Sequence, residues 1–181
     1  MRPGPLCVAQ APWLPAGMRR RTGRVSMGRK GRALLEVPMA DNETFVRDLF
    51  RAWNDRDYDS IAESVAPDCT LVEEGSGRTL QGPEGFTRLA KAMFDAMPDG
   101  TFTLDHLTSQ GDRVVVEYTG SGTQTGDLVL HAGTVPATGR HVTVHACDIY
   151  EVKDGKIHEG RAYLDTGALM SQLGLTEQSR G

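Results

Sequence analysis

The sequence predicts an α+β domain in which helices lie on one side of a strongly curved, mostly antiparallel sheet. Helical periodicity dominates residues 41–97, whereas strand-like alternation and tight turns dominate residues 101–164. Helices and strands that are segregated in this way generally form two packed layers around one core. A curved sheet that wraps a long helix leaves a cleft between them, which is a usual place for a ligand.

Three helices are expected before most of the sheet. The first begins at Asp41 or Asn42, because Asp and Asn cap helices well. A short second helix covers residues 57–65. The third begins at Gly82 with a proline at the position that needs no N–H, and Pro98-Asp99-Gly100 ends it. The first helix has one apolar face, formed by Phe45, Val46, Leu49, Phe50 and Trp53.

Alternation and turn residues define the expected strands. Gln110-Gly-Asp112 and Lys153-Asp-Gly155 are typical of hairpin turns. Residues 134–139 are expected to form a loop, and a closing helix over 166–173 should stop at Gly174. The expected strands cover residues 69–73, 79–80, 101–108, 113–122, 140–152 and 156–164.

The charges separate a basic head from an acidic domain. Residues 1–40 contain eight Lys or Arg and one acid, so their net charge is +7; the remaining residues contain twelve Lys or Arg and twenty-three acids, which gives −11 and a total of −4. The Gly- and Pro-rich head lacks hydrophobic periodicity and is expected to be disordered. Met39 precedes the first helix directly, which favours an over-extended translation start; a disordered tail and a binding arm are the alternatives. We expect a domain over 41–175 and a tail over 176–181.

The composition excludes several classes of protein. Hydrophobic residues make up 39% and charged residues 24% of the chain, as in globular domains. No run of about 18 apolar residues could span a membrane. The widely spaced Cys7, Cys69 and Cys147 fit neither a disulfide framework nor a zinc site. An acidic domain argues against nucleic-acid binding. We therefore expect a cytoplasmic protein without nucleic-acid or membrane partners.

Five strings occur in an order and spacing that are more informative than any one of them. They are residues 50–59 (FRAWNDRDYD), 82–85 (GPEG), 135–140 (VPATGR), 148–157 (DIYEVKDGKI) and 163–165 (YLD), the last followed by 172–174 (QLG). In these strings the chain resembles the SnoaL-like polyketide cyclase (ester cyclase) group of the nuclear transport factor 2-like superfamily. The resemblance extends from about Glu43 to Leu175.

The resemblance implies a fold and an activity. Enzymes of the group close a ring by intramolecular aldol condensation in an aromatic polyketide ester, without a metal or cofactor. An aspartate at the end of the last long strand acts as the general acid and base, and Asp165 matches that position. The resemblance also implies a cone-shaped α+β barrel that usually forms a homo-oligomer, such as a dimer, through its sheet.

The chemistry of Asp165 depends on whether its face of the last strand lines the pocket. A carboxyl group serves as a general acid and base when an apolar pocket raises its pKa toward neutrality. Alternation places Glu159, Arg161, Tyr163 and Asp165 on one face of the last strand. If this face lines the pocket, Arg161 would lower the pKa of the carboxyl group. The alternative interpretation is that Asp165 only caps the following helix.

Glu73 and Gln124 are further candidates, because SnoaL-like proteins or related steroid isomerases have functional residues at the matching positions. Glu73 ends an early strand, where related steroid isomerases have a proton-shuttling carboxylate; an exposed strand-end acid is the simpler interpretation. The tyrosine that those isomerases have on the first helix is Leu49 here. Gln124 stands where many members of the group have His, and it can hydrogen-bond a carbonyl without titrating.

The other candidates are neighbours of the pocket. Asp148 is favoured over His145, because the two lie on opposite faces of one strand. No metal site is expected, although His131 and His141 lie near His145 in sequence. Tyr163 could orient a ligand carbonyl. Pocket-lining aromatic residues are expected to include Phe50, Trp53 and Tyr118.

The expected function is a cofactor-independent enzyme of the cyclase or isomerase type, acting on a small apolar carbonyl compound such as a polyketide. One alternative is a non-catalytic binding or assembly domain with the same cavity. Another is an epoxide hydrolase or steroid isomerase. An epoxide hydrolase of this superfamily uses an Arg-x-Asp pair on one strand, and the strand region here has none.

Overall fold

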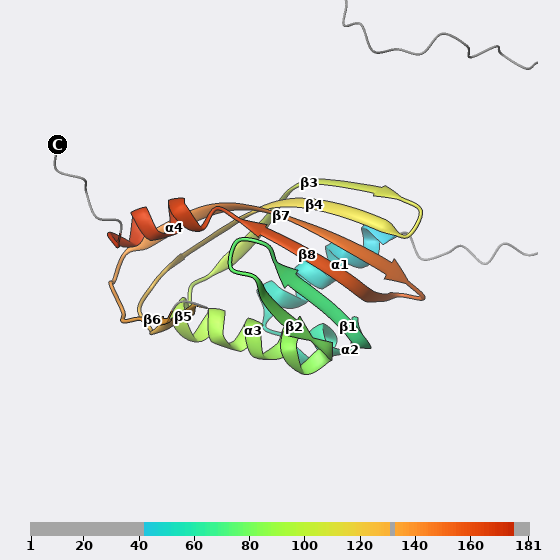
Figure 1. Ribbon diagram of the computed structural model, residues 1–181, viewed down its shortest axis with the longest axis horizontal. Coiled ribbons are helices and arrows are strands. Elements are labelled where there is room, and N and C mark those ends of the chain that lie inside the picture. Colours follow the sequence, from blue (N-terminus) through green and yellow to red (C-terminus); the bar gives the residue numbers. More distant parts are fainter. Residues whose placement is uncertain (1–41, 131–132, 176–181) are drawn as a thin grey trace, which may run out of the picture. The chain divides into compact units, whose positions relative to one another are not determined.

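The computed structural model describes residues 42–130 and 133–175, which form one α+β domain (Figure 1). The basic head, the tail and His131 lie outside the described residues. The expected fold class is confirmed. In chain order, the elements are α1 (Asn42–Asp55), α2 (Tyr58–Glu63), β1 (Val65–Glu73), β2 (Arg78–Gln81), α3 (Gly82–Ala96), β3 (Thr101–Gln110), β4 (Arg113–Thr123), β5 (Leu128–Leu130), β6 (Gly133–Val135), β7 (His141–Lys153), β8 (Lys156–Leu164) and α4 (Thr166–Leu173).

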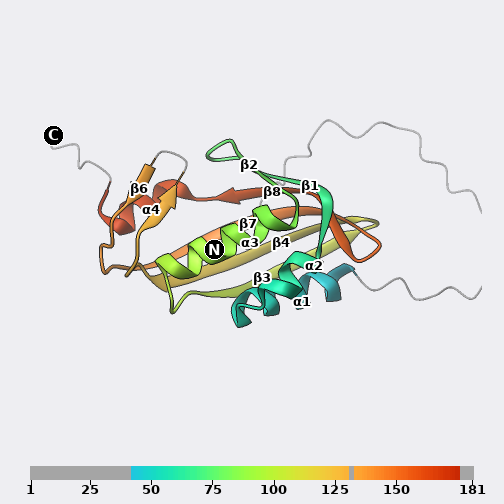
Figure 2. The same ribbon diagram turned by 90° about the horizontal axis from the view of Figure 1, so that it is seen from below.

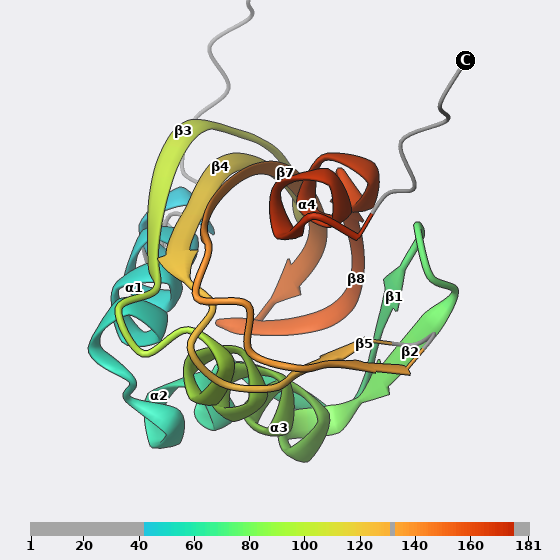
Figure 3. The same ribbon diagram turned by 90° about the vertical axis from the view of Figure 1, so that its left-hand side faces the viewer.

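Six strands form the main sheet, in the order β2-β1-β8-β7-β4-β3. All neighbours in it are antiparallel except β1 and β8. Figure 3 shows β3, β4, β7 and β8 as a strongly curved layer, and Figure 2 shows α3 lying along the sheet. Helix α1 packs against β3 and β4, and α3 packs against β1 and β5. The concave side of the sheet is therefore covered by helices.

Two features differ from the sequence-based expectations. A small β5-β6 hairpin occupies part of the region expected to be a loop. The parallel pairing of β1 with β8 joins Thr70–Glu73 to residues almost 90 positions later. Neither follows from local patterns, because the hairpin has no tight two-residue turn signal and parallel pairing depends on tertiary register. Among the described residues, no helix is long and apolar enough to cross a membrane.

Local chemistry explains where the helices begin and end. The side chain of Asp57 accepts a hydrogen bond from the backbone N–H of Ser60 and so caps α2. Asp165 caps α4 in the same way, through the N–H of Ala168. Gly174 follows α4 with a φ of 76°, a left-handed conformation that glycine adopts without steric cost.

The core has two parts. The larger one joins α1, α2, α3 and the sheet around fully buried residues such as Val46, Ile61 and Val116. The smaller one lies where α4 packs on β7, and contains Ala96, Leu128, Val142, Leu169 and Leu173. Asn54 ties α1 to β3, since its amide donates to the carbonyl of Phe102 and accepts from the N–H of Phe102, both at 2.8 Å.

Replacing Asn54 tests this connection. Asn54→Ala leaves both backbone groups of Phe102 without these partners, and we expect the free energy of unfolding to fall by about 2 kcal/mol. Urea unfolding measures it. Asn42→Ala is the control: it removes an exposed hydrogen bond to Gly111 and should cost less than about 0.5 kcal/mol. Equal losses for the two variants would contradict the role of Asn54.

Candidate active site

A cavity of about 920 Å³ lies between the concave face of the sheet and helices α1, α3 and α4. Its size is typical of sites for small organic molecules. Most of its lining is apolar, and Phe50, Trp53 and Phe102 contribute aromatic rings. The charged residues of the lining are Glu73, Arg78, Arg88 and Asp148.

The cavity exists because the inward face of the sheet carries small side chains beside large ones. Side chains alternate along a strand, so the even-numbered residues of β4, of β7 and of β8 from Gly160 onward point inward. Gly120 and Ala162 stand on this face next to Tyr118 and Asp148. The ring of Phe102 from neighbouring β3 lies over Gly120, and Ala162 leaves room beside Asp148.

Asp148 is the one carboxyl group of the described cavity lining that is almost fully buried, with 6% of its surface exposed. Its Oδ2 accepts hydrogen bonds from the hydroxyls of Tyr150 at 2.6 Å and Tyr118 at 3.4 Å. Its Oδ1 has no hydrogen-bond partner within the described part of the chain. Burial raises the pKa of Asp148 to about 7, although the two tyrosine hydroxyls act in the opposite direction; the charge of Glu73 raises it further.

The two tyrosines remain protonated beside this carboxyl group. Burial raises the pKa of Tyr118 and of Tyr150 well above the usual range, and the negative charge of Asp148 adds to the effect. Both hydroxyls therefore stay donors toward Oδ2. A proton taken up by Asp148 belongs on Oδ1, because Oδ2 already accepts two hydrogen bonds. Near neutral pH, Oδ1 can thus donate a proton or accept one.

Aromatic packing fixes Tyr118. Its ring meets Phe50 edge-on at a centroid distance of 5.0 Å and Phe102 at 5.8 Å. Trp53 in turn packs edge-on against Phe102 at 5.8 Å. Such pairs have defined geometry. The position of the Tyr118 hydroxyl consequently depends on side chains from α1 and β3.

Glu73 and Arg78 form an ion pair at the wall of the cavity. The Arg78 Nε donates to Glu73 Oε2 at 2.8 Å, and its Nη2 donates to the other carboxylate oxygen. Both side chains are roughly three-quarters buried. Glu73 lines the cavity as expected, but its carboxylate is already paired with the guanidinium of Arg78.

Asp165 does not lie at the floor of the cavity, and that expectation was wrong. Its side chain is exposed, and its Oδ1 accepts from the N–H of Ala168 at 2.8 Å. Alternation along β8 was predicted correctly, but the face that ends in Asp165 points outward. Tyr163 and Arg161 share this face: Tyr163 is 42% exposed, and Arg161 lies 3.9 Å from Glu74. Neither lines the cavity.

Gln124 is fully buried but does not line the cavity either. Its amide nitrogen lies 3.1 Å from the carbonyl oxygens of Gly126, Val135 and Pro136. Its Oε1 accepts from the backbone N–H and the hydroxyl of Thr138. Every polar atom of the side chain is used to close the 124–138 segment, so the expected role in orienting a ligand carbonyl was wrong.

Some of the remaining candidates line the cavity and others lie outside it. Phe50, Trp53, Tyr118 and Asp148 line the cavity as expected. His141 and His145 are exposed, outside the lining. Within residues 42–130 and 133–175, no cluster of three His, Cys, Asp or Glu is suited to a metal ion.

Tyr150 was missed by the sequence analysis. It follows Asp148 by two positions and so shares its face of β7. The signal was present: Val142, Val144, Ala146 and Val152 make that face apolar, with Asp148 its one charged member. A buried carboxyl group needs a hydrogen-bond donor, and a tyrosine two residues away can supply one.

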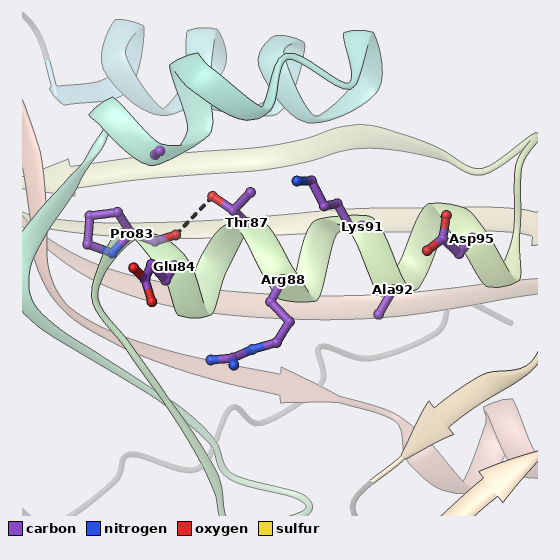
Figure 4. Close-up of a pocket in the computed structure, with 8 residues that line it drawn as sticks. Pro83, Glu84, Thr87, Arg88, Lys91, Ala92 and Asp95 are labelled. Atoms are coloured by element: carbon purple, nitrogen blue, oxygen red, sulfur yellow. Dashed lines mark hydrogen bonds between the residues drawn. The ribbon is translucent and has the colours of Figure 1, made fainter.

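A second hollow lies on the outer side of α3, toward α2 (Figure 4). It is open, and exposed Glu84, Lys91 and Asp95 contribute to its lining. It holds no buried titratable group, so it offers none of the chemistry of the cavity.

Comparisons with known proteins place the chain in a family and a fold. Residues 43–173 match the family model for SnoaL-like polyketide cyclases. None of the curated proteins compared with the chain matches it. The sequence is 27% identical to TsrD from Streptomyces laurentii, with a TM-score of 0.65, over 78% of this chain and 100% of TsrD. It is 25% identical to IdmH from Streptomyces antibioticus, a candidate polyketide cyclase, with a TM-score of 0.61, over 72% of this chain and 96% of IdmH. AclR from Streptomyces galilaeus, a candidate hydroxylase, is 23% identical, with a TM-score of 0.66, over 77% and 85% of the two chains; at this identity it shows the fold alone.

The raised pKa of Asp148 predicts a specific pH dependence of stability. The folded state holds the proton up to about pH 7, whereas the unfolded carboxyl group loses it near its ordinary value of 3.8. The wild type should therefore lose stability as pH rises through this window. Between pH 3.8 and about pH 7, the free energy of unfolding of Asp148→Asn should rise relative to that of the wild type by up to about 1.4 kcal/mol per pH unit. Above this range the difference should stay constant.

Urea unfolding of both proteins across this pH range measures the difference. Asp165→Asn is the control, because it makes the same substitution at an exposed side chain outside the cavity lining. A constant difference between Asp148→Asn and the wild type at all pH values would show that Asp148 ionises normally.

Proposed function

We propose, since the chain belongs to the SnoaL-like polyketide cyclase family, that it is a cofactor-independent enzyme that carries out acid–base chemistry on a small, mostly apolar carbonyl compound. Asp148 is the proposed acid and base. The observation that carries this proposal is the buried Asp148 carboxyl group, which faces an apolar cavity, receives two tyrosine hydroxyls on Oδ2 and leaves Oδ1 without a partner.

An intramolecular aldol condensation illustrates how one carboxyl group can serve twice. Ionised Asp148 removes a proton from a carbon next to a carbonyl group, which leaves an enolate and the neutral acid. The enolate carbon attacks a second carbonyl of the same molecule, so a carbon–carbon bond forms and an alkoxide appears. Oδ1–H returns the proton to the alkoxide. A pKa of about 7 suits both transfers at neutral pH.

The two tyrosines act on the carboxyl group itself. Both hydroxyls donate to Oδ2, so they stabilise the ionised form that begins and ends the cycle. Without them, burial would raise the pKa of Asp148 further, and the fraction of active carboxylate at neutral pH would fall. Tyr150 and Tyr118 therefore serve as positioning residues for the acid–base group.

The substrate class follows from the lining of the cavity. Phe50, Trp53 and Phe102 present aromatic faces and edges, which suit flat unsaturated rings. A volume of about 920 Å³ accommodates a molecule of several fused rings. An aromatic polyketide ester combines these features with adjacent carbonyl groups, and IdmH is itself described as a candidate polyketide cyclase.

Non-catalytic binding is the second candidate, and one observation favours it. Asp165, which matches the catalytic aspartate of the group, is exposed and caps a helix. A chain that has lost that group could retain the cavity to carry a ligand. The epoxide hydrolase alternative has less support: the position two residues before Asp148 is Ala146 rather than arginine, and Arg161 lies outside the cavity lining.

Turnover of a panel of aromatic polyketide esters tests the assignment. Asp148→Asn keeps the shape of the side chain but cannot exchange a proton, so we expect kcat to fall at least about 100-fold. Tyr150→Phe should reduce the rate by about 10-fold and raise the pKa seen in the rate–pH profile.

Asp165→Asn is the matched control and should change kcat less than about threefold, because its side chain is exposed. Loss of turnover in Asp165→Asn with normal rates in Asp148→Asn would reject Asp148 as the acid–base group. Esters that bind to the wild type without any turnover would establish the binding function instead.

A further inference from the structure

One positive charge of the cavity lining has no ion-pair partner among the described residues. Four charged residues line the cavity, and Arg78 is paired with Glu73. Asp148 is buried beside two tyrosines, away from any ion pair among the described residues. Arg88 forms no ion pair with any described residue, although acids greatly outnumber bases in residues 41–181. The lining therefore contains one uncompensated guanidinium.

Arg88 stands at the rim of the cavity. It lies on α3, is exposed, and belongs to the lining together with Arg78, Thr79 and Ala92. Figure 4 shows its side chain leaving α3 on the side away from α2, whereas Lys91 extends toward α2. The ammonium group of Lys91 lies 5.2 Å from the ring centre of Tyr58. Both cations also line the second hollow on the outer side of α3, but Arg88 alone of the two borders the cavity.

We propose that Arg88 binds a carboxylate of the substrate, whose apolar body occupies the cavity. This inference rests on the proposed function, in that the same cavity holds the ligand. A guanidinium is planar and presents two parallel N–H groups that fit the two oxygens of a carboxylate. One uncompensated positive charge matches a singly charged carboxylate better than a phosphate dianion. The substrate is then an apolar carbonyl compound that also has a free acid group, held at the rim while its rings lie inside.

The lining divides recognition between two groups of residues. The apolar lining and the Asp148 cluster act on rings and carbonyl groups, and Arg88 fixes the direction in which the molecule enters. An ester or amide at the same position would keep the apolar contacts but lose the charge-assisted hydrogen bonds. Arg88 is therefore a specificity-determining residue rather than a catalytic one.

A pair of fluorescent probes tests this directly. Pyrenebutyrate has a polycyclic body and a free carboxylate, and its methyl ester differs only in lacking the charge. In fluorescence titrations of the full chain, we expect the acid to bind about fivefold more tightly than the ester at low salt. The preference should shrink at about 0.5 M NaCl, because salt screens a partly exposed ion pair.

The variants separate Arg88 from its neighbourhood. Arg88→Gln should bind the acid and the ester equally, with the affinity for the ester unchanged. Lys91→Gln removes the same charge one helical turn away and should keep the fivefold preference. Equal affinities of the wild type for both probes, or an equal loss in both variants, would overturn the proposal. So would displacement of the acid by millimolar inorganic phosphate, which would indicate a general anion site. These experiments measure binding and not turnover. The Arg88 proposal can therefore fail while Asp148 is confirmed as the acid–base group, and Asp148 can be rejected while the Arg88 proposal is confirmed.

Discussion

Burial of one carboxyl group on the concave face of the sheet is the constraint on which the rest of the site depends. A charged group in an apolar place is costly unless it is protonated or hydrogen-bonded. Asp148 meets this requirement through Tyr150 and Tyr118. Tyr150 is held within the main core, and Tyr118 is held by Phe50 and Phe102. The packing of α1 on the sheet thus also helps to hold the tyrosine that donates to the buried Asp148 carboxyl group.

The cavity depends on a different set of contacts at the other end of the domain. Gln124 closes the 124–138 segment with hydrogen bonds to its backbone, and this brings β5 against α3. Gly126 makes the close approach: a Cβ there would lie 2.3 Å from the carbonyl oxygen of Asp95. Leu128 then joins Ala96 and Leu169 in the smaller core. A buried amide outside the cavity lining therefore helps to set the wall of the cavity.

The sequence predicted which residues share a face but not always which face is buried. Helical periodicity and glycine turns predicted the helices and the β3-β4 and β7-β8 hairpins to within a few residues, because these signals are local. The pairing of β1 with β8 could not be predicted, since parallel register is a tertiary property. For β8, the face with Glu159 and Arg161 was placed inside because Asp165 belongs to it. The small residues of the opposite face, Gly160 and Ala162, were the physical signal that the cavity lies on their side.

The same reasoning explains why Asp148 and Asp165 have such different properties. A residue at the end of a strand borders solvent and can satisfy its carboxylate with the N–H groups of the next helix, as Asp165 does. A residue in the middle of a strand has its backbone committed to the sheet, and Asp148 has neighbouring strands on both sides. Its carboxyl group must find donors among inward-facing side chains, which on this face are tyrosines. The strand-end Asp165 therefore has a helix N-terminus as its partner, whereas the mid-strand Asp148 has tyrosine hydroxyls. The first carboxylate is exposed, and the second is buried with a pKa close to neutral pH.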